Sequence, residues 1–223
     1  QALIEARTPT ALLAHDERLL TPLGRQVLGD WVRNRRLIVV DVDRAADILQ
    51  VLKFAERENL RIAIAKGAEA WRVAAELAAA KVPVILDPFA NLPASFDEVG
   101  ATRQNAVRLA RAGVEIAFSL TDRGPDRARV LRQAAGNAVA QGLPWETALA
   151  AITRVPAALF GALDEVGTIE VGKRADLVLW SGDPLEVSSI AEQVFFDGRP
   201  IDMRSRQTEL RDRYVERLRP SFR

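Results

Sequence analysis

Short apolar runs alternate with amphipathic segments through the middle of the chain. Between the runs, apolar positions recur at intervals of three and four, as from Ala45 to Ala55, and this spacing predicts helices. The runs themselves are short and rich in Val and Ile, which is typical of buried parallel strands. They cover residues 37–40, 61–65, 82–86 and 114–118. The pattern therefore predicts four βα units in a row.

Consecutive βα units place parallel strands in one sheet with helices outside it. Units of about 30 residues fit an eightfold barrel, and they also fit an open doubly wound sheet. Four units supply only half of a barrel. Because half a barrel leaves two strand edges unpaired, we expect it to pair with a missing N-terminal half or with a second copy of itself.

The pattern changes after residue 160. Residues 166–180 predict strands punctuated by Gly167 and Gly172, which suit turns with positive φ. Residues 194–201 predict a hairpin with Asp197-Gly198 as its two-residue turn. We therefore divide the chain into three parts. These are a βα barrel segment over residues 1–160, a β-sandwich segment over residues 161–204 and a charged helical tail over residues 205–223.

Composition narrows the range of functions. The chain has 31 basic and 30 acidic residues and a net charge of +1, so its overall charge favours neither nucleic acid nor an anionic membrane. No apolar run approaches the roughly 20 residues of a membrane span. The absence of cysteine excludes disulfides, zinc–thiolate sites and thiol catalysis. These features predict a cytoplasmic protein whose partner is a small-molecule substrate.

One glycine-punctuated stretch carries a family resemblance. Residues 167–180 read Gly-Thr-Ile-Glu-Val-Gly-Lys-Arg-Ala-Asp-Leu-Val-Leu-Trp, and Gly182-Asp183-Pro184-Leu185 follows. With the later Val-Phe-Phe-Asp-Gly-Arg of residues 194–199, they resemble the C-terminal end of amidohydrolase-superfamily proteins, in particular the imidazolonepropionase-like and dihydroorotase-like branches. The resemblance extends over about residues 35–203. The turn glycines by themselves explain this stretch as structural.

The resemblance implies a fold and an activity. The fold would be the C-terminal half of a TIM-type (β/α)8 metal-dependent hydrolase barrel, strands five to eight, with a small β-sandwich module. The activity would be hydrolysis of carbon–nitrogen bonds other than peptide bonds by metal-activated water. A complete family member would use a divalent metal, typically zinc. The alternative is a catalytically inactive scaffold or binding protein with this fold, without a bound metal.

The resemblance also implies site residues at the strand ends. Asp122 follows the last strand, where the family has an aspartate, and is the predicted catalytic residue and metal ligand. Asp41 follows the first strand of this segment, where the family has a metal-binding histidine, and is a second predicted metal ligand. Lys66 follows the next strand, also at a histidine position, and is predicted to bind substrate; its positive charge could orient an acidic substrate or replace the charge of a metal. The single histidine, His15, matches no ligand position of the family.

The residues also admit structural roles at each of these positions. Asp122 could cap the following helix or pair with a nearby arginine. Asp41 could form an ion pair with Arg44 or serve as a helix cap. Lys66 could be a solvent-facing lysine at a strand end.

Overall fold

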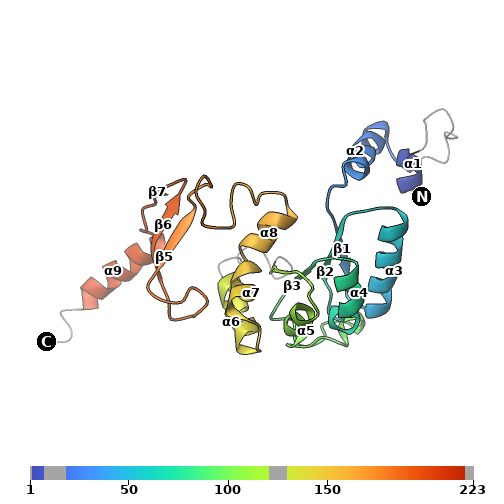
Figure 1. Ribbon diagram of the computed structural model, residues 1–223. Helices are drawn as coiled ribbons and strands as arrows, with labels where there is room; N and C mark the ends of the chain where they lie inside the picture. The colour runs from blue at the N-terminus through green and yellow to red at the C-terminus, as the bar shows by residue number, and fades with distance from the viewer. Residues whose placement is uncertain (1, 8–18, 121–129, 219–223) are drawn as a thin grey trace.

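A four-stranded parallel sheet forms the centre of the molecule. Figure 1 shows the computed structural model, which describes residues 2–7, 19–120 and 130–218. The strands follow one another in the order β1 (Ile38–Val42), β2 (Ile62–Lys66), β3 (Val84–Leu86) and β4 (Ile116–Phe118). A doubly wound sheet reverses its strand order at a switch point, and no reversal occurs among these four strands. The order confirms the predicted βα units and matches one half of a TIM-type barrel.

Helices connect the strands. They are α3 (Ala45–Arg57), the 3-10 turn η3 (Ala70–Val73) with α4 (Ala74–Ala79), η4 (Phe96–Glu98), α5 (Asn105–Arg111) and α6 (Leu131–Ala140). The sequence predicts one continuous helix over residues 70–80, whereas the structure has a 3-10 turn before a shorter α-helix. Within that turn, Trp71 donates from Nε1 to the carbonyl oxygen of Gly100 at 2.9 Å, which ties η3 to the loop before α5.

Four further helices flank this half-barrel. They are α1 (Ala2–Arg7), α2 (Pro22–Arg33), α7 (Trp145–Ala150) and α8 (Arg154–Leu159). The sequence analysis missed α2, although Thr21-Pro22 is a typical start signal. The Thr21 Oγ1 accepts a hydrogen bond from the Gly24 N–H at 3.1 Å and so caps this helix.

The two faces of the sheet are buried to different extents. One face packs against the helices and carries the main core, where Ile48, Ile64, Leu77 and Leu109 are completely buried. The second face has a smaller cluster, in which Ala117 packs with Val155 and Leu159 of α8. Farther along this second face Val39 is 42% exposed. The half-barrel therefore leaves part of its inner face uncovered.

A small antiparallel sheet follows, formed by β5 (Leu177–Trp180), β6 (Ala191–Phe196) and β7 (Arg199–Pro200). Phe196 lies opposite Arg199, which confirms the predicted hairpin around Asp197-Gly198. The prediction of strands throughout residues 166–176 is wrong, because this part consists of turns. Gly167 and Gly172 have φ values of +97° and +91°, which glycine adopts without strain, so each permits a turn in this stretch.

This sheet, which we call the β module (residues 177–200), is docked on α6. The Arg132 guanidinium donates to the carbonyl oxygens of Pro184, Glu186 and Ser189 at 3.1, 2.6 and 3.0 Å. At Gly136 the two parts approach so closely that a Cβ would lie 2.3 Å from the Leu185 carbonyl oxygen. Helix α9 (Arg206–Leu218) extends away from the module, as Figure 1 shows. None of the described helices has both the length and the apolar character that crossing a bilayer requires.

Candidate active-site rim

The carboxyl ends of the four parallel strands meet at one edge of the sheet, which we call the rim. In barrel enzymes this edge carries the active site, because the loops after the strands converge there. Asp41 and Asp43 lie at the end of β1, Lys66 ends β2, and Asp87 and Ser119 follow β3 and β4. The chain therefore delivers charged or polar residues to the rim at the end of each of the four parallel strands.

Asp41 and Lys66, both predicted as site residues, come together at the rim. Their strands are in register, with Val42 opposite Lys66. The Lys66 Nζ lies 3.5 Å from the Asp41 Oδ2, and the two side chains remain 41% and 63% exposed. Asp41 thus forms an ion pair with Lys66 rather than with Arg44, so the pairing predicted as its structural alternative is wrong. Lys66, on the neighbouring strand, is the ion-pair partner of Asp41, although Arg44 is nearer to Asp41 along the chain.

The backbone at Lys66 is held in an unusual conformation. Lys66 has φ +70° and Gly67 has φ +62°, both in the left-handed region. A residue with a side chain rarely adopts this conformation and keeps it only where its surroundings impose it. Here the Gly67 N–H donates to the Val42 carbonyl oxygen at 3.0 Å, and the buried Asn105 donates from Nδ2 to the Gly67 carbonyl oxygen at 2.8 Å.

Asp43 is a rim residue that the sequence analysis did not single out. Its Oδ1 accepts a hydrogen bond from the Ala68 N–H at 3.0 Å, which links the β1–α3 loop to the turn after β2. Burial raises the pKa of the Asp43 carboxyl, and the carboxylates of Glu98 and Asp97 raise it further, against the lowering effects of the Ala68 hydrogen bond and the Lys66 charge. The signal was present in the sequence, since Asp43 follows a predicted buried strand just as Asp41 does.

Asp87 was also not singled out. It stands directly after β3, and its Oδ1 accepts a hydrogen bond from the Phe89 N–H at 2.7 Å. This contact forms an Asx-type turn at the start of the following loop. One carboxylate oxygen of Asp87 therefore stabilises the conformation of that loop.

Two residues weighed from the sequence, Asp122 and His15, lie outside the described residues. The predicted roles of Asp122 as catalytic residue and metal ligand remain predictions. Ser119, three positions earlier, follows β4 directly and is described by the structure. Its N–H donates to the Leu86 carbonyl oxygen at 3.1 Å, which extends the β3–β4 pairing as far as the rim.

The described rim does not fit a divalent metal. Such ions take several oxygen or nitrogen ligands, whereas the Asp41 carboxylate already has an ammonium 3.5 Å away. Among the residues that the structure describes, no group of three or more His, Cys, Asp or Glu side chains could hold a metal. No step of a reaction is therefore assigned to a metal on these residues.

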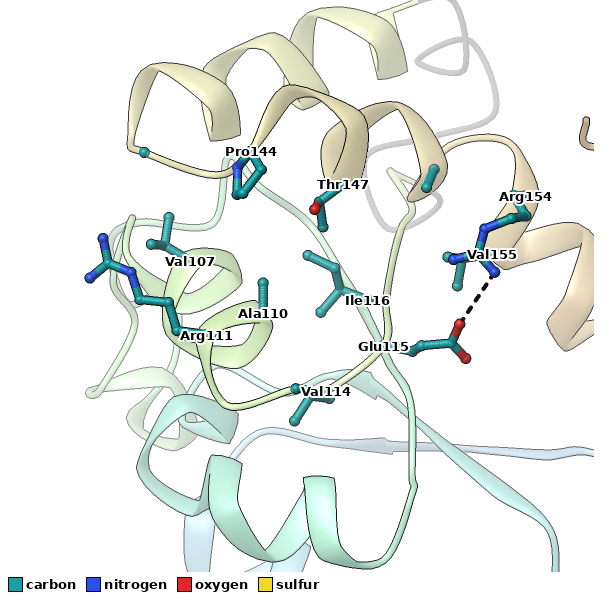
Figure 2. Close-up of a pocket in the computed structure, with 13 residues that line it drawn as sticks. Val107, Ala110, Arg111, Val114, Glu115, Ile116, Pro144, Thr147, Arg154 and Val155 are labelled. Carbon is teal, nitrogen blue, oxygen red and sulfur yellow. Dashed lines mark ion pairs between the residues drawn. The ribbon is translucent and has the colours of Figure 1, made fainter.

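A cavity of about 500 Å³ lies at the opposite, amino end of β4. Figure 2 shows Val114, Glu115 and Ile116 on one side of it, with Thr147 of α7 and the ion pair between Arg154 and Glu115, which are 3.6 Å apart, at its border. The amino ends of barrel strands contribute to stability rather than catalysis. This cavity is therefore separate from the rim.

The comparisons with known proteins decide the family. The sequence profile described as "Amidohydrolase family" matches residues 72–202, which is more than half of the chain. The chain belongs to the amidohydrolase family. The turns at Gly167 and Gly172, and the hydrogen bond at 3.0 Å from the Asp197 N–H to the Asp176 Oδ1, give the C-terminal stretch of this amidohydrolase chain a structural role.

Two solved structures and one curated protein are similar to this chain. An amidohydrolase from Thermotoga maritima MSB8 superposes with a TM-score of 0.76 and 31% identity, over 84% of this chain and 49% of that protein. The imidazolonepropionase of Maricaulis maris (strain MCS10) is 38% identical over 101 residues, which are 43% of this chain and 25% of that protein. An adenosine deaminase from Xanthomonas campestris with bound zinc shares the fold, with a TM-score of 0.55 and 21% identity, over 86% of this chain and 53% of that protein. The amidohydrolase chain thus spans about half, or less, of the length of these relatives.

Proposed function

We propose that the chain forms the C-terminal half of a hydrolase that cleaves carbon–nitrogen bonds other than peptide bonds. The observation that carries this proposal is the rim, where β1 and β2 bring the Asp41 carboxylate and the Lys66 ammonium within 3.5 Å of each other. Opposite charges at the carboxyl edge of a barrel are suited to binding a polar substrate and orienting it. Membership of the amidohydrolase family supports hydrolysis as the reaction.

Two residues receive roles in this proposal. Lys66 binds the substrate, and its ammonium donates a hydrogen bond to the carbonyl oxygen, where negative charge develops during attack by water. Asp122 is the predicted base that takes a proton from the attacking water. The sequence also predicts Asp41 and Asp122 as ligands of a divalent metal. Because the described rim does not fit a divalent metal, the roles proposed for Lys66 and Asp122 do not depend on one.

The uncovered surfaces support a partner for this half-barrel. Strand β1 pairs on one side only among the described strands, and Val39 of the same strand is partly exposed on the inner face. Apolar side chains on the β module are also exposed, including Val178, Leu179 and Phe196. An N-terminal half with four more βα units would cover the inner face and pair with both edges. Pairing with a second copy of this chain is the alternative.

A complementation experiment tests the function. The chain would be produced alone and together with the N-terminal half of the Thermotoga maritima amidohydrolase. Association would be measured by sedimentation, and release of ammonia or amine from cyclic amides, N-acyl amino acids and N-carbamoyl amino acids would be assayed. An imidazolone belongs in the panel because one relative is named imidazolonepropionase.

We expect a one-to-one complex that hydrolyses at least one member of this panel, and we expect the Asp122→Asn variant of the complex to lose that activity. A folded complex without activity toward any of these substrates would favour the non-catalytic scaffold. That alternative is supported by the same rim, since its described residues do not assemble a set of metal ligands. A stable monomer that associates with neither partner would contradict the half-barrel assembly.

A further inference from the structure

The Asp41–Lys66 ion pair has a fixed place on the sheet. Both residues belong to adjacent parallel strands in continuous register from Ile38 opposite Ile62 to Val42 opposite Lys66. The Lys66 Nζ and the Asp41 Oδ2 are 3.5 Å apart, so the ammonium stands beside the carboxylate at a distance typical of a loose ion pair. Both side chains are partly exposed, so small ions and small molecules can reach them.

The turn that carries Lys66 is held from two sides. On the β1 side, the Ala68 N–H donates to the Asp43 Oδ1 at 3.0 Å, and the Glu69 N–H donates to the Asp43 carbonyl oxygen at 2.9 Å. On the α5 side, Asn105 donates to the Gly67 carbonyl oxygen. A lysine in the left-handed region is strained and persists only where such contacts over-determine it. The fold therefore sets the starting direction of the Lys66 side chain toward the end of β1.

Two aspartates at the end of β1, Asp41 and Asp43, interact with the Lys66 ammonium. Asp41 pairs with it directly, and Asp43 is influenced both by its positive charge and by the negative charges of Glu98 and Asp97. Carboxylates that share a site repel one another unless a cation stands among them. The Lys66 ammonium pairs with Asp41, and its positive charge also acts on Asp43.

We propose that the Lys66 ammonium is the resident cation of the β1–β2 rim and occupies the position that a divalent metal would need beside Asp41. The rim then presents a fixed organic cation, and a polar oxygen of a bound small molecule meets Nζ in place of a metal ion. The role of this cation in hydrolysis rests on the proposed function. The exclusion of metal ions by this cation does not rest on the proposed function, because it depends only on residues of this chain.

Manganese binding tests the proposal directly. The full chain and its Lys66→Gln and Lys66→Asn variants would be titrated with Mn²⁺, and free Mn²⁺ would be followed by its electron paramagnetic resonance signal. Asparagine tolerates the left-handed backbone at this position, which makes it the milder replacement. The Lys66→Arg variant is the matched control, because it keeps the positive charge.

We expect the wild-type chain and Lys66→Arg to show no Mn²⁺ binding that depends on Asp41. Removing the ammonium should create Mn²⁺ binding that depends on Asp41 and is at least about tenfold tighter than any binding by the wild-type chain, because the repulsion from a positive charge about 4 Å away is lost. Adding Asp41→Asn to Lys66→Gln should abolish that gain. Neutral variants that keep the wild-type circular dichroism spectrum and melting temperature yet gain no binding would overturn the proposal.

A second comparison does not depend on the folding of the Lys66 variants. The wild-type chain and Asp41→Asn should bind Mn²⁺ equally, because the ammonium already occupies the site. If the wild type binds Mn²⁺ more tightly than Asp41→Asn, Asp41 is a metal ligand and the proposal is wrong. Neither titration measures hydrolysis, so this failure can be told apart from failure of the proposed activity.

Discussion

Asn105, the first residue of α5, donates a hydrogen bond from Nδ2 to the carbonyl oxygen of Gly67, 2.8 Å away and 38 residues earlier in the chain. The side chain is buried, and no partner accompanies its Oδ1 within the part of the chain that the structure describes. A buried side-chain amide whose N–H group is hydrogen-bonded but whose oxygen is not stabilises the folded state less than a fully hydrogen-bonded amide does. Asn105 thereby supports the turn that carries Lys66.

Replacing this amide should destabilise the fold. In Asn105→Ala the buried Gly67 carbonyl oxygen loses its side-chain donor, and we expect a loss of about 1–3 kcal/mol in the free energy of unfolding. Urea denaturation followed by circular dichroism measures it. The control is Asn137→Ala, because the exposed Asn137 only donates to the Gln133 carbonyl oxygen of its own helix, and its change should stay within about 0.5 kcal/mol. Equal changes in the two variants would contradict the special role of Asn105.

Gly67 should tolerate a side chain poorly for two reasons. Its φ is +62°, and an added Cβ would lie 3.1 Å from the Ala70 Cβ and 3.3 Å from the Val84 Cγ1. We expect Gly67→Ala to lower the free energy of unfolding by about 2–4 kcal/mol. Gly113 separates the two causes, because its φ is +84° but nothing lies within 4 Å of an added Cβ. Gly113→Ala should therefore cost only about 1 kcal/mol, and a similar loss in both variants would show that crowding at Gly67 is unimportant.

The sequence predicted the elements whose signals are local. The four apolar runs became β1 to β4, and the Asp197-Gly198 turn formed the expected hairpin. The strands expected over residues 166–176 did not form, since a stretch of mixed apolar and polar residues with glycines at 167 and 172 is compatible with both strands and successive turns. Local patterns do not decide between these outcomes without the packing partner.

The candidate site was predictable only in part. Asp41 and Lys66 were identified because the family resemblance implies ligand positions at these strand ends, but their pairing depends on the register between β1 and β2, which the sequence does not state. Arg44 is nearer along the chain and was therefore the expected partner. The support of the Lys66 turn by Asn105 was beyond prediction, because it joins residues from different βα units.

The raised pKa of Asp43 makes a prediction about pH. A raised pKa means that the folded state holds this proton more tightly than the unfolded state does, so stability falls as pH rises from the ordinary value of 3.8 through the raised folded value. Asp43→Asn removes the ionisation and keeps an oxygen that can accept from the Ala68 N–H. Its melting temperature relative to the wild type should therefore increase between about pH 4 and pH 7, by a few degrees at most. Thermal melts across this range measure the difference.

The matched control for Asp43 is Asp212→Asn, which changes an exposed carboxylate on α9. Its melting temperature should follow that of the wild type at each pH, because Asp212 lies far from the rim along the chain and pairs only locally with Arg211. A wild-type minus Asp43→Asn difference that stays constant with pH would contradict a raised pKa at Asp43.

Arg132 should be the principal anchor of the β module. Its guanidinium donates to three carbonyl oxygens of residues 184–189 and lies 4.9 Å from the centroid of the Trp180 ring. In Arg132→Ala these carbonyl groups lose a charged donor, and we expect a loss of about 2–4 kcal/mol in the free energy of unfolding. Arg132→Lys keeps the charge but not the planar fork, so it should fall between alanine and the wild type. The exposed Arg103→Ala variant is the control and should change stability by less than about 0.5 kcal/mol.

Amide hydrogen exchange can locate the effect of Arg132. If the guanidinium holds the module on α6, exchange in Arg132→Ala should accelerate over β5 and β6 while the amides of β2 and β3 keep their protection, because local opening then precedes global unfolding. The close contact at Gly136, where α6 meets the Leu185 carbonyl oxygen, should open together with the module. Uniform acceleration across both sheets would instead mean that the module and the half-barrel unfold as one unit, and that Arg132 stabilises the whole chain rather than the junction.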